Sequence, residues 1–148
     1  MYKRQYLWWE QVPKVYLPFA VRAYRPPCDP YEPNDDRRTN PWGPLVSGQS
    51  YRAKLCAGDA EDNYYFDASA SGKATLYLTL PSSLVNHTSI WLYAQSNLST
   101  PICGTGPVKT GEYSTQCTIS QAGRYIVRLY TDGTYDNANE YILRVTFP

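Results

Sequence analysis

The sequence lacks three features that would each define a class of protein. Its 148 residues contain no apolar run near the roughly 20 residues that span a bilayer, and no stretch of helical periodicity long enough to name. Charge of one sign is not in excess either, since 14 Lys and Arg against 13 Asp and Glu leave a formal net charge of +1. We therefore expect no membrane span, no nucleic-acid partner and no polybasic membrane patch.

Residues that carry catalysis are also scarce. The one histidine, His87, stands in an Asn-His-Thr segment typical of a surface turn, with no glycine-flanked serine nearby to complete a triad. No Cys-x-x-Cys pair is present, which argues against zinc. The glycines of Gly104-Thr105-Gly106 precede Pro107, as in a turn rather than a phosphate loop. We expect the chain not to be an enzyme.

The residues that are abundant favour β structure. Tyrosine occurs 15 times and tryptophan 4 times, while 12 prolines and 9 glycines interrupt short apolar runs. Within these runs apolar and polar residues alternate, which is typical of strands with one buried face. The residues expected to face inward are Leu76, Leu78, Leu80, Ile90, Leu92, Tyr125, Val127, Leu129, Tyr141, Leu143, Val145 and Phe147. The pattern predicts a single all-β domain built as a sandwich.

Four cysteines, Cys28, Cys56, Cys103 and Cys117, indicate two disulfides and hence an oxidising, extracellular compartment. The N-terminus nevertheless shows no signal peptide. Residues 1–5, Met-Tyr-Lys-Arg-Gln, match the translation of a common sequencing-adapter sequence read from a GTG start. If they are such an artefact, the chain is the tail of a longer reading frame and the missing signal peptide carries no information.

The chain divides near Cys28. Residues 1–27 contain several prolines and are expected to be a tether to an upstream domain. Within them, Lys14–Arg22 resembles the stretch that precedes small domains in many exported bacterial proteins, although a plain edge strand explains it equally well. Residues 28–148 form the expected domain, which opens with a loop rich in Asp, Asn, Pro and Gly at 29–44.

An opening motif and five downstream motifs in this domain occur in the order of a known family. Asp29–Asp35 (Asp-Pro-Tyr-Glu-Pro-Asn-Asp) resembles the opening of the bacterial pre-peptidase C-terminal domain, and Leu45–Gly48 its first strand entry. The segments Asp59–Phe66, Ser89–Tyr93, Ala122–Leu129 and Glu140–Val145 resemble its later strands. The resemblance, which extends to the collagen-binding domains of clostridial collagenases, implies a jelly-roll-like antiparallel β-sandwich attached to a secreted protein.

The same resemblance implies a calcium site between two acidic segments. Carried over position by position, its ligands are Glu32, Asn34, Asp35, Asp59 and Asp62. An upstream acidic ligand of the relatives falls at Pro30, so Asp29 or a backbone carbonyl would have to replace it. Aspartates usual in the fourth strand are also absent, because His87, Thr88 and Ser89 stand there. Without a metal, these segments would be two solvated acidic turns.

Two disulfides, Cys28–Cys56 and Cys103–Cys117, are the pairing we expect. Cys28 directly precedes the Asp29 loop and Cys56 precedes Asp59, so convergence of the loops on a metal brings these two cysteines together. Cys103 and Cys117 flank a segment rich in Gly and Pro, as the two arms of a hairpin would.

An outward set of aromatic and arginine side chains is the second candidate site. Such residues favour protein and carbohydrate interfaces, although some of them could instead pack beneath loops. The set comprises Tyr77, Trp91, Tyr93, Arg128, Tyr130 and Arg144.

The sequence therefore supports a non-catalytic, calcium-binding accessory domain of a secreted bacterial protein, such as a peptidase. The alternatives are a collagen- or polysaccharide-binding module that uses this face, and a structural spacer of a surface protein.

Overall fold

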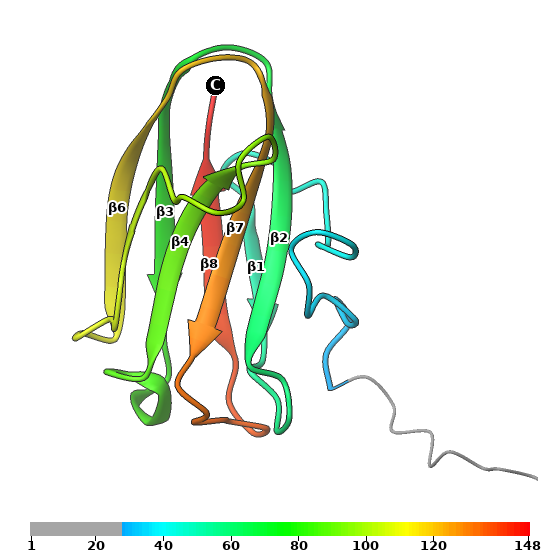
Figure 1. Ribbon diagram of the computed structural model, residues 1–148. Coiled ribbons are helices and arrows are strands. Elements are labelled where there is room, and N and C mark those ends of the chain that lie inside the picture. Colours follow the sequence, from blue (N-terminus) through cyan, green and yellow to red (C-terminus); the bar gives the residue numbers. More distant parts are fainter. Residues whose placement is uncertain (1–27) are drawn as a thin grey trace, which may run out of the picture.

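The computed structural model describes residues 28–148 (Figure 1). The expected tether, the Lys14–Arg22 stretch and residues 1–5 lie outside the described residues. Eight strands and one turn of 3-10 helix make up the described part. They are β1 (Ser50–Ala53), β2 (Glu61–Ala68), β3 (Gly72–Thr79), η1 (Ser82–Leu84), β4 (Thr88–Ala94), β5 (Cys103–Thr105), β6 (Glu112–Ile119), β7 (Gly123–Thr131) and β8 (Tyr141–Thr146). No helix within residues 28–148 is long and apolar enough to cross a membrane.

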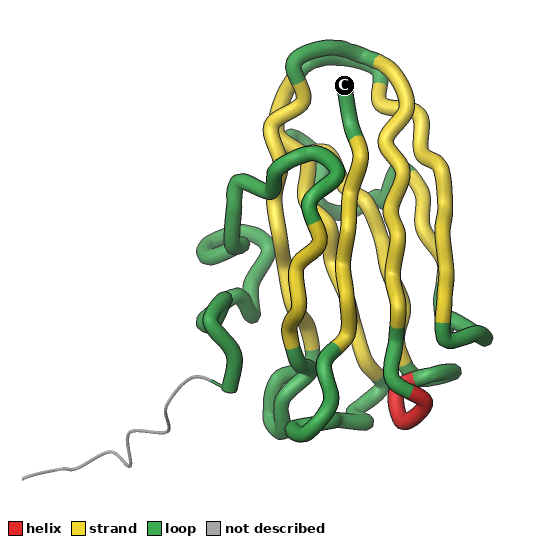
Figure 2. Tube along the Cα trace, turned by 180° about the vertical axis from the view of Figure 1, so that it is seen from behind, coloured by secondary structure: helices red, strands yellow, loops and turns green. Residues whose placement is uncertain are grey.

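The strands form two antiparallel sheets of four strands each. The first sheet has the order β1-β8-β3-β6 and the second has the order β2-β7-β4-β5. Every connection between consecutive strands except β4–β5 crosses from one sheet to the other, which is the winding of a jelly roll. Figure 2 shows the strands running along the length of the molecule, with the helical turn and most connecting loops at its ends and a long loop segment along one side. The predicted all-β sandwich is confirmed.

The core lies between the sheets and is built from the residues that alternate in the sequence. Leu76 and Leu78 of β3 are at most 1% exposed, and Val127 and Leu129 of β7 are fully buried opposite them. The strands of each sheet thus turn every second side chain inward, because successive residues of a strand point to opposite faces. The remaining predicted inward residues are also buried, apart from Phe147, which is partly exposed and stacks on Phe66 at a centroid distance of 4.3 Å.

The segment before β1 packs along the outer strand β2 rather than hanging free (Figure 1). Its backbone makes four bonds to β2: Asn63 N–H to Asn34 O at 3.0 Å, Trp42 N–H to Asn63 O at 2.9 Å, Tyr65 N–H to Trp42 O at 2.9 Å and Leu45 N–H to Tyr65 O at 2.8 Å. Gly43 makes this approach possible, since a Cβ there would stand 2.5 Å from the carbonyl oxygen of Tyr65. The acidic opening of the domain is thereby held beside the start of β2.

Both disulfides join the expected cysteines, Cys28 to Cys56 and Cys103 to Cys117. The expectation that Cys103 and Cys117 lie on the arms of one hairpin is wrong. Cys103 begins β5, which pairs with β4 in the second sheet, whereas Cys117 lies on β6, which pairs with β3 in the first. Because β5 and β6 are the edge strands of different sheets, this bond links the two sheets at one edge of the sandwich.

Candidate metal centre

Three carboxyl groups from two separate segments meet at one end of β2. Glu32 lies on the segment before β1, Asp59 lies in the turn before β2, and Asp62 is the second residue of β2. One oxygen from each of the three lies within 4.8 Å of the others. The structure thus brings together residues that are 27 positions apart in the sequence, 32 and 59.

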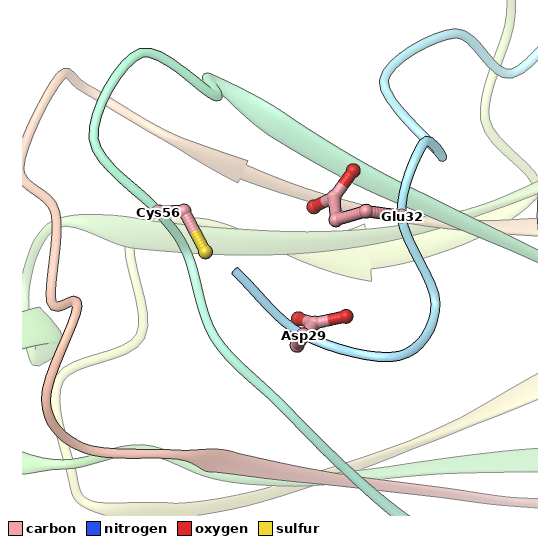
Figure 3. A group of neighbouring side chains, drawn as sticks. All are labelled: Asp29, Glu32 and Cys56. Atoms are coloured by element: carbon pink, nitrogen blue, oxygen red, sulfur yellow. The ribbon is translucent and has the colours of Figure 1, made fainter. Parts of the chain in front are cut away.

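The backbone around Glu32 is fixed by Asp29. One oxygen of the buried Asp29 carboxylate accepts a bond from Tyr31 N–H at 2.8 Å, and the other accepts one from Lys54 N–H at 2.8 Å. The second bond ties the start of the segment to the stretch that follows β1. Figure 3 shows Asp29 and Glu32 on one segment and Cys56 on the other, with Glu32 and Cys56 pointing into the same space.

Asp59 is placed by a tight turn. Its N–H donates to Cys56 O at 3.0 Å, and its Oδ1 accepts from Glu61 N–H at 3.3 Å. An aspartate is well suited to this position because its short side chain bonds the backbone two residues on. The second oxygen, Oδ2, is left free to face Glu32 and Asp62.

Asp62 is connected to the interior of the sandwich. Its Oδ2 accepts a hydrogen bond from the hydroxyl of Tyr141 on β8, and that hydroxyl also pairs with Tyr64 OH at 2.6 Å. Asp62, Tyr64 and Tyr141 are each fully buried. Since β2 and β8 belong to different sheets, this chain of bonds ties the Asp62 carboxyl to the opposite sheet across the core.

Four buried oxygens in this cluster have no hydrogen-bond partner among the described residues. Three belong to the carboxyl groups, Glu32 Oε1, Asp59 Oδ2 and Asp62 Oδ1, and the fourth is Oδ1 of the nearby Asn34, whose Nδ2 is also unpaired. Buried polar atoms are normally paired, and leaving one unpaired costs about 1–3 kcal/mol, more for a charged group. These oxygens are therefore available to ligate a cation.

The pKa values of the three carboxyl groups support this reading. Burial, together with the adjacent Asp59 carboxyl, raises the pKa of Glu32 to about 8. Burial likewise raises the pKa of Asp59 to about 8, with a contribution from the charge of Asp62. Burial raises the pKa of Asp62 to about 7, although the hydrogen bond from Tyr141 acts in the opposite direction. The protein confines three acids where their negative charges are unfavourable unless a cation offsets them.

The donor set fits a hard cation. The available atoms are carboxylate oxygens and the amide oxygen of Asn34, which is fully buried. Cys56 also lies within 4.8 Å of Asp29 and Glu32, but its sulfur is bonded to Cys28 and is not a thiolate ligand. These residues could therefore hold a metal ion that prefers oxygen.

The remaining expected ligand, Asp35, lies at the margin of the cluster. Asp35 is exposed, yet its carboxyl is close enough to contribute to the raised pKa of Asp59.

The sequence predicts Tyr141 only as an inward residue of the last strand, and it does not predict the bond from Tyr141 to Asp62. A tyrosine at a fully inward position was the available signal, because a buried hydroxyl needs a polar partner.

The second candidate site does not form one surface, and the prediction of a single binding face is wrong. Tyr77 on β3 and Arg144 on β8 are paired neighbours on the outer face of the first sheet, where the guanidinium lies 4.1 Å from the ring centroid. The other four residues, Trp91, Tyr93, Arg128 and Tyr130, are on β4 and β7 of the second sheet. The sandwich separates the two groups, because outward residues of its two sheets point in opposite directions.

Two members of the second group have structural partners. Tyr93 is only 6% exposed, because Arg37 from the segment before β1 covers its ring at 5.1 Å from the centroid. Arg128 forms an ion pair with Glu61, to which Arg37 is also paired at 4.0 Å. Tyr130, at 40% exposed, is the most accessible residue of the group.

Comparison with known proteins gives a likeness in structure alone. The sequence matches no protein-family model and no curated protein. The pre-peptidase C-terminal domain of a collagenase from Bacillus anthracis superposes with a TM-score of 0.55 at 18% identity, covering 69% of this chain and 91% of that chain. The secreted serine protease VesC from Vibrio cholerae gives a TM-score of 0.45 at 14% identity over 73% of this chain and 22% of that chain. The first likeness confirms that the described part of the chain has the fold of a pre-peptidase C-terminal domain.

Proposed function

We propose that residues 28–148 are a non-catalytic accessory domain of a secreted bacterial protein, stabilised by calcium bound between Glu32, Asn34, Asp35, Asp59 and Asp62. The observation that carries this proposal is the group of buried, unpartnered oxygens on Glu32, Asn34, Asp59 and Asp62. A cation there would neutralise the carboxylates and fix the segment before β1 against the sandwich.

Calcium suits this donor set better than other common metals. Zinc prefers nitrogen and thiolate donors, and the cluster offers oxygens. Magnesium requires nearly octahedral geometry and retains several waters, whereas calcium accepts six to eight oxygens in irregular arrangements. A cluster assembled from a loop, a turn and a strand end, rich in carboxylates, matches the second description.

An accessory role in a secreted protein is supported by the fold and the disulfides. The solved domain with the same fold is a pre-peptidase C-terminal domain of a collagenase. Two disulfides in a domain of this size are typical of an oxidising compartment outside the cytoplasm. The protein joined upstream of Cys28 is proposed to be a secreted hydrolase such as a peptidase, with the domain aiding its secretion, stability or targeting.

Calcium titration of the full chain tests the site. We expect calorimetry to show calcium binding, and Asp59→Asn to lower the calcium affinity by at least about tenfold. Mutation of groups that only hydrogen-bond to metal ligands already lowers metal affinity by this much. Asp59→Asn removes one negative charge and one ligand oxygen from the cluster with little change in shape. The amide can still accept the bond from Glu61 N–H that shapes the turn.

The matched control for this titration is Asp67→Asn. Asp67 lies at the other end of β2, exposed and paired with Arg124 at 2.8 Å. Its replacement also removes one negative charge from the domain, so it corrects for general electrostatic attraction of calcium. Equal affinities for both variants, or no binding by the parent chain at millimolar calcium, would contradict the proposed site.

A binding module for an extracellular protein or polysaccharide is a second candidate, favoured by the accessible ring of Tyr130 beside Arg128 on the second sheet. If this face binds a polymer, the chain should sediment with insoluble collagen or with a polysaccharide. Tyr130→Ala should then release it, while Tyr77→Ala on the opposite sheet should not. A chain that stays in the supernatant with every polymer tested contradicts this candidate.

A further inference from the structure

The Cys28–Cys56 disulfide joins the two segments that supply the cluster. On one side, Cys28 lies four residues before Glu32, and on the other, Cys56 lies three residues before Asp59. Cys56 O is the acceptor that closes the turn at Asp59, and its sulfur lies within 4.8 Å of carboxylate oxygens of Asp29 and Glu32. Figure 3 shows the side chains of Cys56, Asp29 and Glu32 in this arrangement.

The two parts of the segment before β1 differ in how firmly they are held. From Asn34 onward the backbone is bonded to β2, for instance by Asn63 N–H to Asn34 O at 3.0 Å and by Trp42 N–H to Asn63 O at 2.9 Å. Between Cys28 and Pro33, the attachments to the rest of the domain are the disulfide, the bond from Lys54 N–H to Asp29, and the Tyr31 ring, which packs edge-on against Trp42 at a centroid distance of 4.6 Å. Glu32 is on this less firmly held part.

We infer that the Cys28–Cys56 disulfide positions Glu32 for the cation, so that cation binding and the integrity of this disulfide are thermodynamically coupled. This inference rests on the proposed calcium site. Breaking the bond removes the covalent attachment of the Cys28–Pro33 stretch and loosens the position of Glu32, while Asp59 and Asp62 stay in place on β2 and its turn. The cation then loses one well-placed carboxylate but keeps the others, so its affinity falls without vanishing.

Coupling acts in both directions. If calcium binds the oxidised chain more tightly than the reduced chain by some factor, saturating calcium must disfavour reduction of the disulfide by the same factor. In exchange with dithiothreitol, the Cys28–Cys56 bond is reduced to two thiols while dithiothreitol is oxidised to its cyclic disulfide. Calcium should therefore shift this equilibrium towards the protein disulfide.

The second disulfide provides the matched control. Cys103–Cys117 links β5 to β6 at one edge of the sandwich, on strands that supply no member of the cluster. We expect the double variant Cys28→Ser with Cys56→Ser to bind calcium about tenfold more weakly than the parent chain, the range typical of groups that orient metal ligands. The double variant Cys103→Ser with Cys117→Ser should keep the parent affinity.

A redox titration of the parent chain gives a readout that needs no substitution. In dithiothreitol buffers with calcium or with chelator, alkylation and mass spectrometry report the reduced fraction of each pair. Calcium should shift the Cys28–Cys56 equilibrium about tenfold and leave Cys103–Cys117 unchanged, whereas a general stabilisation of the fold would shift both.

Two results would overturn the coupling alone. One is equal calcium affinity in the parent chain and the Cys28→Ser/Cys56→Ser variant, and the other is an equal shift of both disulfides by calcium. Absence of calcium binding by the oxidised chain overturns the proposed function and the coupling with it.

Discussion

In chelator, the melting temperature of the chain is expected to fall as the pH rises from about 5 to about 8, and calcium is expected to remove most of this fall. The folded domain raises the pKa of Glu32 and Asp59 to about 8 and that of Asp62 to about 7. In the unfolded chain these groups ionise near pH 4. The folded state therefore binds more protons across this interval, and its stability decreases as they are lost.

Asp62 gives the scale of this effect, because it is fully buried and solvent screens its charge least. A rise from the model value of 3.8 to about 7 corresponds to roughly 4 kcal/mol at 1.36 kcal/mol per pKa unit. For a domain of this size, 1 kcal/mol shifts the melting temperature by about 4 °C. We therefore expect calcium to raise the melting temperature by about 10 °C or more at pH 8 and by much less at pH 5. Thermal melts followed by circular dichroism measure both.

Asp62→Asn separates this explanation from a general effect of pH. The amide is similar in shape to the protonated carboxyl and can still accept the bond from Tyr141, but it does not ionise. In chelator at pH 8 this variant should melt at a higher temperature than the parent chain, and calcium should raise its melting temperature far less. Asp67→Asn should behave as the parent does. A parent chain with the same melting temperature in calcium and in chelator at pH 8 would contradict the proposal.

Phe66→Ala is expected to lower the free energy of unfolding by about 3–5 kcal/mol, as large aromatic truncations in a core do. Phe66 is fully buried between the sheets and stacks on Tyr125 and Phe147 at centroid distances of 5.6 and 4.3 Å. Alanine leaves a cavity on the inner face of β2 that these two rings cannot fill without moving. Urea unfolding in calcium measures the loss.

Tyr130→Ala is the control, because that ring is 40% exposed and its removal should change stability by about 0.5 kcal/mol or less. Phe66 lies four residues along β2 from Asp62, on the order of 13 Å away. The two sites should therefore act independently, and calcium should stabilise Phe66→Ala as much as it stabilises the parent chain. A loss below about 1 kcal/mol would show that the core closes around the missing ring.

Alternation along the chain was sufficient to identify the core. Leu76 and Leu78, like Val127 and Leu129, are inward residues in the sequence pattern and are buried in the structure. A local period of two determines this, because it fixes which side chains of a strand share a face. The Cys28–Cys56 pairing also followed from the position of each cysteine beside an acidic segment. The Cys103–Cys117 pairing was correct although its local argument was wrong, because the two cysteines lie on different sheets and not on one hairpin.

The sequence by itself therefore determined the class of fold, the inward residues and the acidic positions able to form a cation site. Only the tertiary structure decided which outward residues share a surface, since alternation distinguishes inside from outside but does not assign a strand to a sheet. Tyr77 and Trp91 look equivalent in the sequence and lie on opposite sheets, because strand pairing joins β3 to β8 and β4 to β7. The bond from Tyr141 to Asp62 likewise depends on two strands 79 residues apart facing each other across the core. Such contacts come from the winding of the whole chain, which no local pattern encodes.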